Sequence, residues 1–260
     1  MLTNRLLTIA LILSALAPFT AVAQGPSGPV VPPPTAEELV RKMDEVLTFK
    51  TRIAVATMTV TRDGKSDART LRMQSRGWDD SYSEFLAPAR DKGIKYLKVD
   101  KNLYMFLPGT EKVVKVSGHL LRQSLMDSDF SYEDMLESRA LLQDYDAKLL
   151  GSETVDGSDC WVLDLTAKQP GQTYARRKTF IAKATFIPLR VERYAASGLL
   201  LKVMSQSEIK TSGAKLYAAR MRMEDKSRAG SVTELLITDP QFDIEVPAET
   251  FSRRRLMKGD

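Results

Sequence analysis

The stretch "SLMDSDFSYEDML" (Ser124–Leu136) interrupts a sequence that otherwise alternates between apolar and polar residues. Ser131 is followed three residues later by Asp134, which is the spacing of a capping box at the start of a helix. Phe130 directly before the cap and Met135 at the fourth helical position have the spacing of a hydrophobic staple. The stretch therefore predicts a short helix that apolar side chains hold down.

The residues on both sides of this stretch follow the two-residue period of half-buried strands. The segment "RIAVATMTVTRDGKSDARTLRMQSRGW" (Arg52–Trp78) has two such runs around Asp63-Gly64, a strong hairpin signal. Short strands separated this regularly by turns predict a single meandering antiparallel sheet. The other predicted turns lie at Asp100-Lys101, Pro108-Gly109, Asp156-Gly157, Ser197-Gly198, Ser212-Gly213 and Ala229-Gly230.

A helix is predicted before the first strand, over "TAEELVRKMDEVLTFK" (Thr35–Lys50). Thr35 and Glu38 have capping-box spacing, and apolar residues recur on one helical face. A sheet of about ten strands or more must curl, split or close, and the few helical segments cannot cover both of its faces. We therefore predict a mainly β protein whose strongly curved sheet wraps around one or two helices. The apolar helical face consists of Leu39, Val40, Met43, Val46 and Leu47.

The N-terminal residues predict export. Residues 1–23 have the layout of a cleavable signal peptide, in which Arg5 precedes an apolar run and Ala21-Val22-Ala23 precedes the cleavage point. The apolar run is shorter than the roughly 20 residues of a membrane-spanning helix. Residues 24–34 are rich in Pro and Gly and predict a semi-rigid tether. We expect residues 35–260 to form a single domain, since β domains reach this size.

The sequence lacks the patterns that common catalytic and metal sites need. His119, Ser124 and Asp127 are the residue types of a catalytic triad, but no G-x-S-x-G turn accompanies them. A calcium-loop count from Asp127 puts Tyr132 where Gly is required and Ser138 where Glu is required. One His and one Cys cannot supply a zinc site. We predict that the protein is not an enzyme and has no metal ion and no cofactor.

The lone cysteine and the charges exclude further classes. Cys160 has no second cysteine with which to form a disulfide, and we predict that it packs as a small core residue. The net charge is +5, with basic clusters only at residues 176–178 and 253–255. Nucleic-acid binding would need a basic stripe with aromatic stacking groups. We interpret the two clusters as solvated loops, able at most to make transient contact with anionic lipid headgroups.

The strands near the C-terminus predict an apolar inner face. In "YAARMRMED" (Tyr217–Asp225), Tyr217, Ala219, Met221 and Met223 share one face, and Arg220, Arg222 and Glu224 share the other. The chain has 11 methionines, several of them on strands. Because methionine is flexible and polarizable, it suits a surface that fits chains of varying shape, although ordinary core packing is the favoured explanation for any single methionine.

The segment "LRQSLMDSDFSYEDM", preceded by "LYMFLPGTEKVVKVSG", resembles the signature of the outer-membrane lipoprotein-sorting (LolA-like) superfamily. The similarity is to the subgroup with a Leu-Pro strand end, a K-V strand and a G-S-D-F-S-Y-E-D segment. Met126-Asp127 stands where that subgroup usually has Met-Gly, which leaves the local turn open. "RTLRMQSRG" and "IPLRVERYAASGLLLKV" extend the resemblance along the chain.

The resemblance implies a half-open antiparallel β-barrel of about ten or eleven strands, with helices plugging its concave face. It implies a periplasmic carrier that shields the acyl chains of a lipoprotein or lipid during transfer towards the outer membrane. The alternative is an accessory partner of an RND-type lipid export complex. Implied partners are an inner-membrane transporter and an outer-membrane acceptor, and we expect a monomer. The true carriers latch their lid with a strand arginine, for which Arg69 and Arg72 are candidates.

The predicted site is an apolar cavity closed by a lid. Each buried methylene is worth about 0.8 kcal/mol, so a sixteen-carbon chain is worth on the order of 12 kcal/mol. A lid that fills the empty cavity and is displaced by cargo would keep the affinity moderate; a hollow lined with charges would contradict this hypothesis. The predicted cavity and lid residues are Leu71, Met73, Leu103, Met105, Leu125, Met126, Phe130, Met135, Trp161, Leu163, Leu165, Met221 and Met223, and the motif adds Asp129, Ser131, Tyr132, Glu133 and Asp134.

Overall fold

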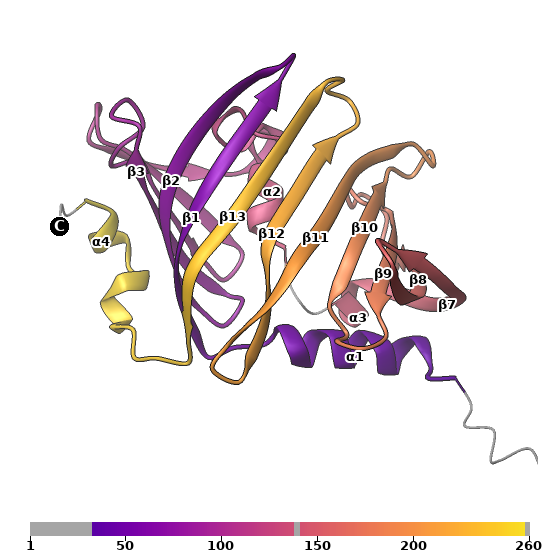
Figure 1. The fold of residues 1–260 in the computed structure, drawn as a ribbon. Helices are drawn as coiled ribbons and strands as arrows, with labels where there is room; N and C mark the ends of the chain where they lie inside the picture. The colour runs from indigo at the N-terminus through magenta and orange to yellow at the C-terminus, as the bar shows by residue number, and fades with distance from the viewer. Residues whose placement is uncertain (1–32, 138–140, 258–260) are drawn as a thin grey trace, which may run out of the picture. The chain divides into compact units, whose positions relative to one another are not determined.

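The computed structural model describes residues 33–137 and 141–257, so the predicted signal peptide and linker residues 24–32 lie outside the described residues. From Pro34 onward the chain forms one compact unit. Within the described residues it contains one sheet of 13 antiparallel strands, in which β1 and β13 pair at the centre (Figure 1). From this central pair, strands β2 to β6 follow one another to one edge and β12 to β7 to the other. The strands are β1 (Thr51–Arg62), β2 (Lys65–Arg76), β3 (Asp80–Ala87), β4 (Lys95–Val99), β5 (Asn102–Leu107), β6 (Lys112–Val116), β7 (Tyr145–Val155), β8 (Ser158–Ala167), β9 (Arg176–Ala182), β10 (Pro188–Tyr194), β11 (Leu200–Ser212), β12 (Lys215–Asp225) and β13 (Ser231–Phe242).

The sheet is strongly curved and does not close, because β6 and β7 stand at its two ends and do not pair with each other. This confirms the predicted mainly β, half-open architecture. The predicted count of about ten or eleven strands is too low. The turn between β9 and β10, over residues 183–187, contains no Gly or Asp, and Phe186 supplies its positive φ of 56°. Without a turn signal this hairpin is hard to recognise from sequence.

The predicted hairpin turns are confirmed where a left-handed residue pair was expected. Asp63 and Gly64 have φ of 50° and 76°, and Asp156 and Gly157 have φ of 47° and 78°. Two consecutive positive φ values define the turn type whose twist matches that of antiparallel strands. The Asp-Gly pairs therefore set the register of β1 with β2 and of β7 with β8.

Helix α1 (Ala36–Leu47) lies along the lower edge of the sheet, towards the right in Figure 1. Its capping box is confirmed: the Glu38 backbone amide donates to Thr35 Oγ1 at 3.2 Å, and the Thr35 amide donates to Glu38 Oε2 at 2.8 Å. Leu39, Val40 and Met43 are buried in one cluster with strands β7 to β9. The apolar face of this helix thus covers one end of the concave surface.

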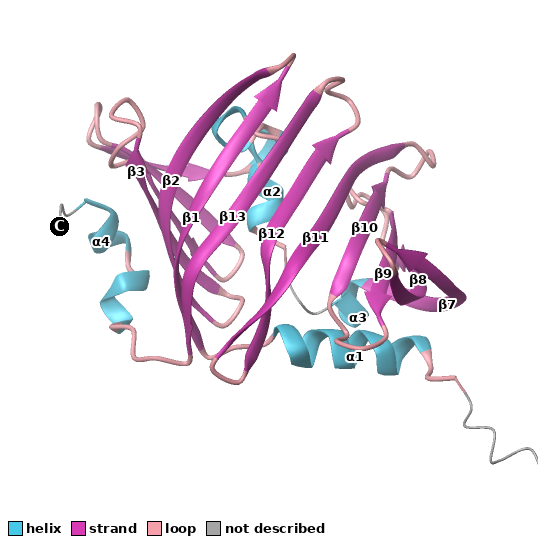
Figure 2. Cartoon of the chain, viewed as in Figure 1, coloured by secondary structure: helices cyan, strands magenta, loops and turns pink. Residues whose placement is uncertain are grey.

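The interruption in the strand pattern forms short helices on the concave side of the sheet, as Figure 2 shows for α2. We call residues 118–137 the covering segment. The capping box predicted at its last helix is confirmed, since Ser131 and Asp134 each accept a hydrogen bond from the other's backbone amide. The helical elements here are η1 (Gly118–Arg122), η2 (Leu125–Asp127) and α2 (Tyr132–Met135); α3 (Leu141–Asp144), η3 (Ala248–Phe251) and α4 (Arg253–Met257) follow later in the chain.

The structure corrects the interpretation of the two basic clusters as solvated loops. Residues 176–178 open strand β9, and Arg177 is buried because its side chain points to the concave side and meets Glu137. Residues 253–255 begin helix α4, where Arg253 and Arg255 lie over the rings of Tyr104 and Tyr82. Cys160 is buried beside Val162 and Phe180, which confirms the prediction of a core residue.

Candidate functional site

The first part of the concave interior is an apolar cluster beneath the start of the covering segment. Leu71 and Leu103 are buried in the sheet, and Leu125 and Met126 of the covering segment pack against the same cluster. The Tyr132 hydroxyl lies 3.8 Å from the sulfur of Met105, and its ring stacks at an angle on Tyr96. The contacts between η1 or η2 and this part of the sheet are therefore mainly contacts of apolar side chains.

The second part of the interior is a buried ion-pair network at the end of α2. Asp134 Oδ2 lies 2.7 Å from Lys202 Nζ, and Asp134 Oδ1 lies 3.3 Å from Arg193 Nη1. The Tyr174 hydroxyl donates to Asp134 Oδ1 at 2.8 Å. Burial by itself would raise the pKa of Asp134, but Arg193 and Lys202 outweigh it and lower the pKa to about 2. Asp134 is therefore a carboxylate that the sheet holds in its charged form.

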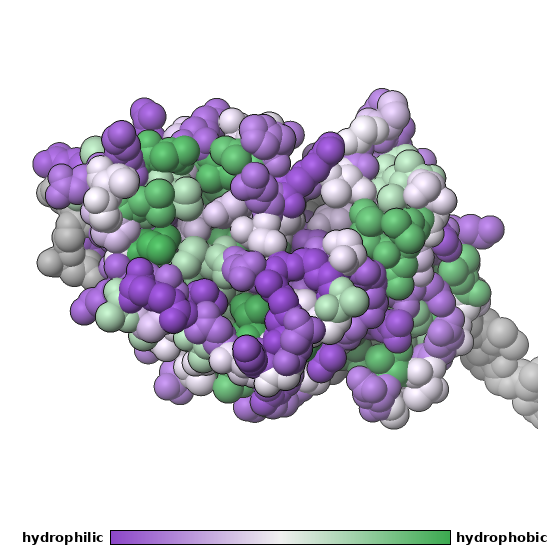
Figure 3. All heavy atoms as spheres, turned by 90° about the horizontal axis from the view of Figure 1, so that it is seen from above, coloured by the Kyte–Doolittle hydropathy of each residue, from purple (hydrophilic) through white to green (hydrophobic). Residues whose placement is uncertain are grey.

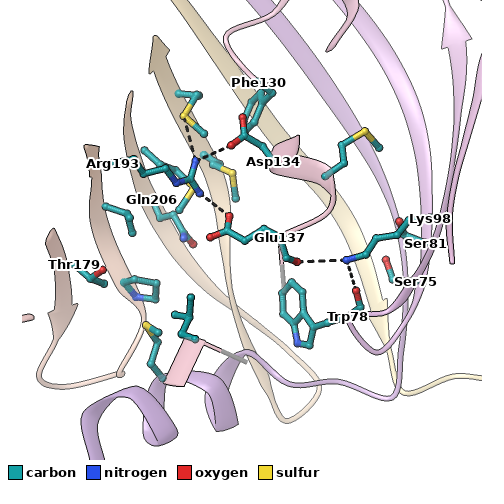
Figure 4. Close-up of a pocket in the computed structure, with 18 of the residues that line it drawn as sticks. Ser75, Trp78, Ser81, Lys98, Phe130, Asp134, Glu137, Thr179, Arg193 and Gln206 are labelled. Atoms are coloured by element: carbon teal, nitrogen blue, oxygen red, sulfur yellow. Dashed lines mark hydrogen bonds and ion pairs between the residues drawn. The ribbon is translucent and has the colours of Figure 1, made fainter. Parts of the chain in front are cut away.

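Glu137 continues the same network. Its Oε2 accepts a hydrogen bond from Arg193 Nη2 at 2.7 Å, and its Oε1 pairs with Arg177. Burial opposes the charge here too, yet Arg177 and Arg193 hold the pKa of Glu137 below its ordinary value. Lys98 donates to the backbone carbonyls of Trp78 and Glu137, as Figure 4 shows together with the Arg193 contacts.

Strand register explains why these cations lie together. Arg193 of β10 is the direct partner of Arg177 on β9 and of Lys202 on β11. Like charges directly opposite each other on neighbouring strands repel. Asp134 and Glu137 are held between them and supply the compensating negative charge. Asp134 and Glu137, at the end of the covering segment, are thus the counter-ions of a row of cations in the sheet.

Two further aspartates connect the middle of the covering segment to the neighbouring strands. Asp129 is buried, and its Oδ2 accepts hydrogen bonds from the hydroxyls of Ser231 at 3.0 Å and Thr233 at 2.7 Å. Asp127 is exposed and pairs with Arg62 and Arg228. The arginine candidate Arg69 pairs with Asp67 and Asp91 instead. Four arginines form ion pairs with the covering segment, and they lie on β1, β9, β10 and the turn before β13: Arg62, Arg177, Arg193 and Arg228.

A cavity of about 260 Å³ lies between the end of the covering segment and strands β10 to β12. Five methionines line it together with Phe130, and the ion-pair network forms part of its wall (Figure 4). Its wall therefore combines flexible apolar side chains with charged ones. The methionines are Met43 of α1, Met135, Met204, Met221 and Met223.

The structure brings only part of the predicted site together. Phe130, Met135, Met221, Met223 and Asp134 line the cavity. Trp161, Leu163 and Leu165 share one face, as predicted, but α1 covers them and they do not line the cavity. The apolar cluster beneath the covering segment includes Leu71, Met73, Leu103, Met105, Leu125, Met126, Tyr132 and Met135, while Asp129 and Ser131 make the hydrogen bonds given above and Glu133 lies half-buried on α2.

Sequence reasoning missed the cations of the interior. Arg193 follows Val191 at the two-residue period, and both line the cavity, so a charged residue stands where the strand pattern expects an apolar one. That signal was available, but the sequence alone does not reveal a partner for it. Asp134 and Glu137 lie 59 and 56 residues away in the chain.

The surface seen from the end that carries the β1–β2 and β12–β13 hairpins shows separate apolar patches divided by polar side chains (Figure 3). Among the described residues, none of the helices has the length and apolar character needed to cross a bilayer. Within the same residues, His, Cys, Asp and Glu side chains do not gather in threes or more in a way that could hold a metal ion.

An open antiparallel sheet with helices on its concave side defines the LolA-like fold, and comparisons agree with this assignment. A family model described as "Uncharacterized protein" matches residues 77–258, and the chain belongs to that family. No curated protein matches the sequence significantly.

Three of the solved structures that resemble this chain come from different bacteria. A DUF1329 family protein from Desulfovibrio piger is 28% identical, with a TM-score of 0.79 over 85% of this chain and 97% of the other. A domain from Vibrio parahaemolyticus, described as an outer membrane lipoprotein-sorting protein domain, is 24% identical, with a TM-score of 0.77 over 86% and 100%. A LolA superfamily protein from Nitrosomonas europaea is also 24% identical, with a TM-score of 0.71 over 86% and 100%.

Proposed function

We propose that this protein is a non-catalytic periplasmic carrier, which shields acyl chains of a lipoprotein or lipid during transfer towards the outer membrane. The observation that carries the proposal is the methionine-lined cavity between the covering segment and strands β10 to β12. Methionine adapts to apolar chains of different shape, as a carrier of flexible cargo requires. The LolA-like fold of the neighbouring structures supports the same class of function.

The apolar part of the covering segment provides a means of exchange. Leu125 and Met126 pack against the buried face of β2 and β5, where an acyl chain would find similar surroundings. Each methylene that enters gains about 0.8 kcal/mol, while each side chain that leaves loses a comparable amount per methylene. The net affinity is therefore a difference between two burials, which lets the cargo move on to a bilayer.

The charges in the interior restrict which part of the covering segment can move. A charged lining counts against an acyl-chain carrier, and charged side chains do form part of this cavity's wall. Asp134 and Glu137 compensate the charges of the cations beside them, whereas Arg52 forms no ion pair within the described residues. Removing one partner of a buried ion pair leaves an uncompensated charge at a cost of about 3–5 kcal/mol. In this proposal α2 stays fixed, and η1 and η2 give way to the cargo.

Lipid extraction tests the proposal directly. The protein purified from the periplasmic fraction of cells that express the full chain is extracted and analysed by mass spectrometry, and we expect co-purifying acyl lipids. In parallel, the uptake and release of a fluorescent fatty acid are measured for the wild type and for Phe130→Ala. We expect the variant to change both rates, because Phe130 lines the cavity.

A control variant and two possible results show whether the lid mechanism and the carrier proposal hold. Leu199→Ala is the control, since Leu199 is 65% exposed and lies away from the cavity lining. Unchanged uptake and release in Phe130→Ala, with thermal unfolding that shows a folded protein, would contradict the lid mechanism. The absence of both co-purifying lipid and probe binding would contradict the carrier proposal itself.

The buried ion pairs favour a second candidate function. Asp134 and Arg193 have side chains only 5% and 2% exposed, so the end of the covering segment is fixed like a permanent plug. Such a plug suits an accessory, non-enzymatic partner of an envelope lipid export complex. This candidate predicts a stable complex with an inner-membrane transporter in affinity purification, and no bound lipid.

A further inference from the structure

A second cavity adjoins the first one beneath the centre of the sheet. It has a volume of about 190 Å³ and an apolar wall that includes Met73, Leu235, Ile237 and Phe242. Together the two cavities reach the range of about 300–1,000 Å³ that is typical of small-molecule sites. Five residues line both cavities and mark the place where they meet: Phe49, Arg52, Trp78, Gln206 and Met221.

Arg52 is the charged residue at this junction. Its guanidinium lies 4.9 Å from the centre of the Phe49 ring. Within the described part of the chain it forms no ion pair, and its buried Nε has no hydrogen-bond partner. The neighbouring interior arginines Arg177 and Arg193 both pair with Glu137. Arg52 thus differs from them in lacking a carboxylate.

The surroundings of Arg52 make this lack of a partner costly. Burial alone lowers the pKa of Arg52 to about 10, so its charge is poorly solvated although it stays protonated at neutral pH. Lys98, which lines the first cavity, differs from Arg52 because the carboxylates Asp79, Glu137 and Asp80 favour its charged form. Of the five residues that line both cavities only Arg52 is charged, so an anion placed beside it would gain charge-assisted hydrogen bonds.

We propose that the joined cavities bind an amphiphile with one negatively charged head group, which Arg52 receives while the apolar tail lies in the second cavity. This inference rests on the proposed carrier function and names its substrate class. A carboxylate or a phosphate head would serve, because the guanidinium fork donates to both in a bidentate manner. An apolar wall with few convergent polar groups is the usual form of such a site.

Three ligands with the same sixteen-carbon tail test the role of the charge. Palmitate, hexadecyl phosphate and neutral hexadecanol are titrated into the full chain, with displacement of a fluorescent acyl probe as the readout. For the wild type we expect the two anions to bind about tenfold or more tightly than hexadecanol, as one charge-assisted hydrogen bond allows. For Arg52→Gln we expect this preference to disappear, with hexadecanol affinity unchanged.

Matched controls separate Arg52 from a general effect of charge. Arg222→Gln removes a cation next to Met221 on the outer face of β12, where Arg222 is 48% exposed, and should leave the preference intact. Arg52→Lys keeps the charge and should retain part of the preference. If Arg52→Gln fails to fold in thermal unfolding, Arg52→Lys provides the equivalent test. It keeps the charge but lacks the fork, so its preference for the two anions over hexadecanol should be smaller than that of the wild type, and an undiminished preference would overturn the inference.

The outcomes distinguish this inference from the carrier proposal. Equal binding of all three ligands, or an Arg52→Gln variant that keeps the preference, overturns the anionic-head inference and leaves the carrier proposal standing. Failure of all three to bind overturns both. Inorganic phosphate and acetate are the tail-free arms, and binding as tight as that of the tailed anions would identify a small-anion site and overturn the amphiphile inference.

Discussion

The two ends of the covering segment are held to the sheet by different forces. At its start, Leu120, Leu121 and Leu125 pack against apolar residues of the strands. At its end, Asp134 and Glu137 pair with cations from β9, β10 and β11. Apolar contacts can be exchanged for contacts with another apolar group at little net cost, whereas a buried ion pair cannot be separated without leaving unpaired charges. The difference indicates where the segment is fixed and where it can yield.

The largest expected effect comes from removing the charge at the fixed end. In Asp134→Asn the cations Arg193 and Lys202 lose their shared carboxylate in a buried site. We expect a loss of about 3–5 kcal/mol in the free energy of unfolding, measured by urea denaturation. Glu133→Gln is the control, because Glu133 lies half-buried on the same helix, whereas the Asp134 side chain is only 5% exposed. A loss below about 1 kcal/mol would show that the ionic end is not the stronger attachment.

Acid titration examines the same end without a mutation. The pKa of Asp134 is about 2 in the folded protein, below its ordinary value of 3.8, and the pKa of Glu137 is lowered as well. Their stabilising contribution is complete above the ordinary values and is lost as the pH falls from about 4 towards 2. For Asp134 this amounts to about 2 kcal/mol. Unfolding free energies measured across this range should fall steeply in the wild type and less steeply in Asp134→Asn; identical slopes would contradict the ion-pair account.

Local features of the fold and the long-range ion-pair network differ in how far the sequence predicts them. The capping box at Ser131 and Asp134 and the Asp-Gly turns are signals carried by residues within four positions of each other, and all of them are found in the structure. The general curved form followed from the number of strands. The row of Arg177, Arg193 and Lys202 depends on the register of three strands, and its counter-ions come from a segment about 40 to 70 residues away. Local sequence patterns do not show which residues so far apart in the chain form ion pairs.

The apolar face of β8 shows the same limit. The sequence placed Trp161, Leu163 and Leu165 correctly on one face, since alternation is a property of the strand alone. It assigned this face to the cargo cavity, whereas α1 covers it with Leu39, Val40 and other apolar residues. Which apolar surface covers which is decided by the folded chain as a whole.

A moderate effect is expected at the end of the covering segment that can yield. Leu125 is half-buried, so Leu125→Ala should lower the free energy of unfolding by about 1–2 kcal/mol, less than a fully buried leucine does. The variant should also take up a fluorescent fatty acid faster than the wild type, because less apolar contact has to be displaced. Leu199→Ala, at an exposed position, serves as the control. Slower uptake would contradict the assignment of the mobile end.

The smallest effect is expected at Asp127, between the two ends. Asp127 has a φ of 63°, and Met126 before it has a φ of 50°, so the turn takes two left-handed residues where the similar subgroup usually has Met-Gly. Asp127→Gly relieves the backbone but removes the exposed pairs with Arg62 and Arg228, each worth about 0.2–1 kcal/mol. The two changes oppose each other, and we expect a net shift within about 0.5 kcal/mol.

Asp127→Ala separates these two contributions, because it removes the ion pairs and keeps the unfavourable backbone conformation. It should be about 1 kcal/mol less stable than Asp127→Gly in urea denaturation. High salt, which screens exposed pairs, should lower the stability of the wild type relative to both variants and leave the gap between Ala and Gly unchanged. If Asp127→Gly instead loses as much stability as Asp134→Asn, the exposed pairs hold the covering segment as firmly as the buried ones, and the distinction between its two ends fails.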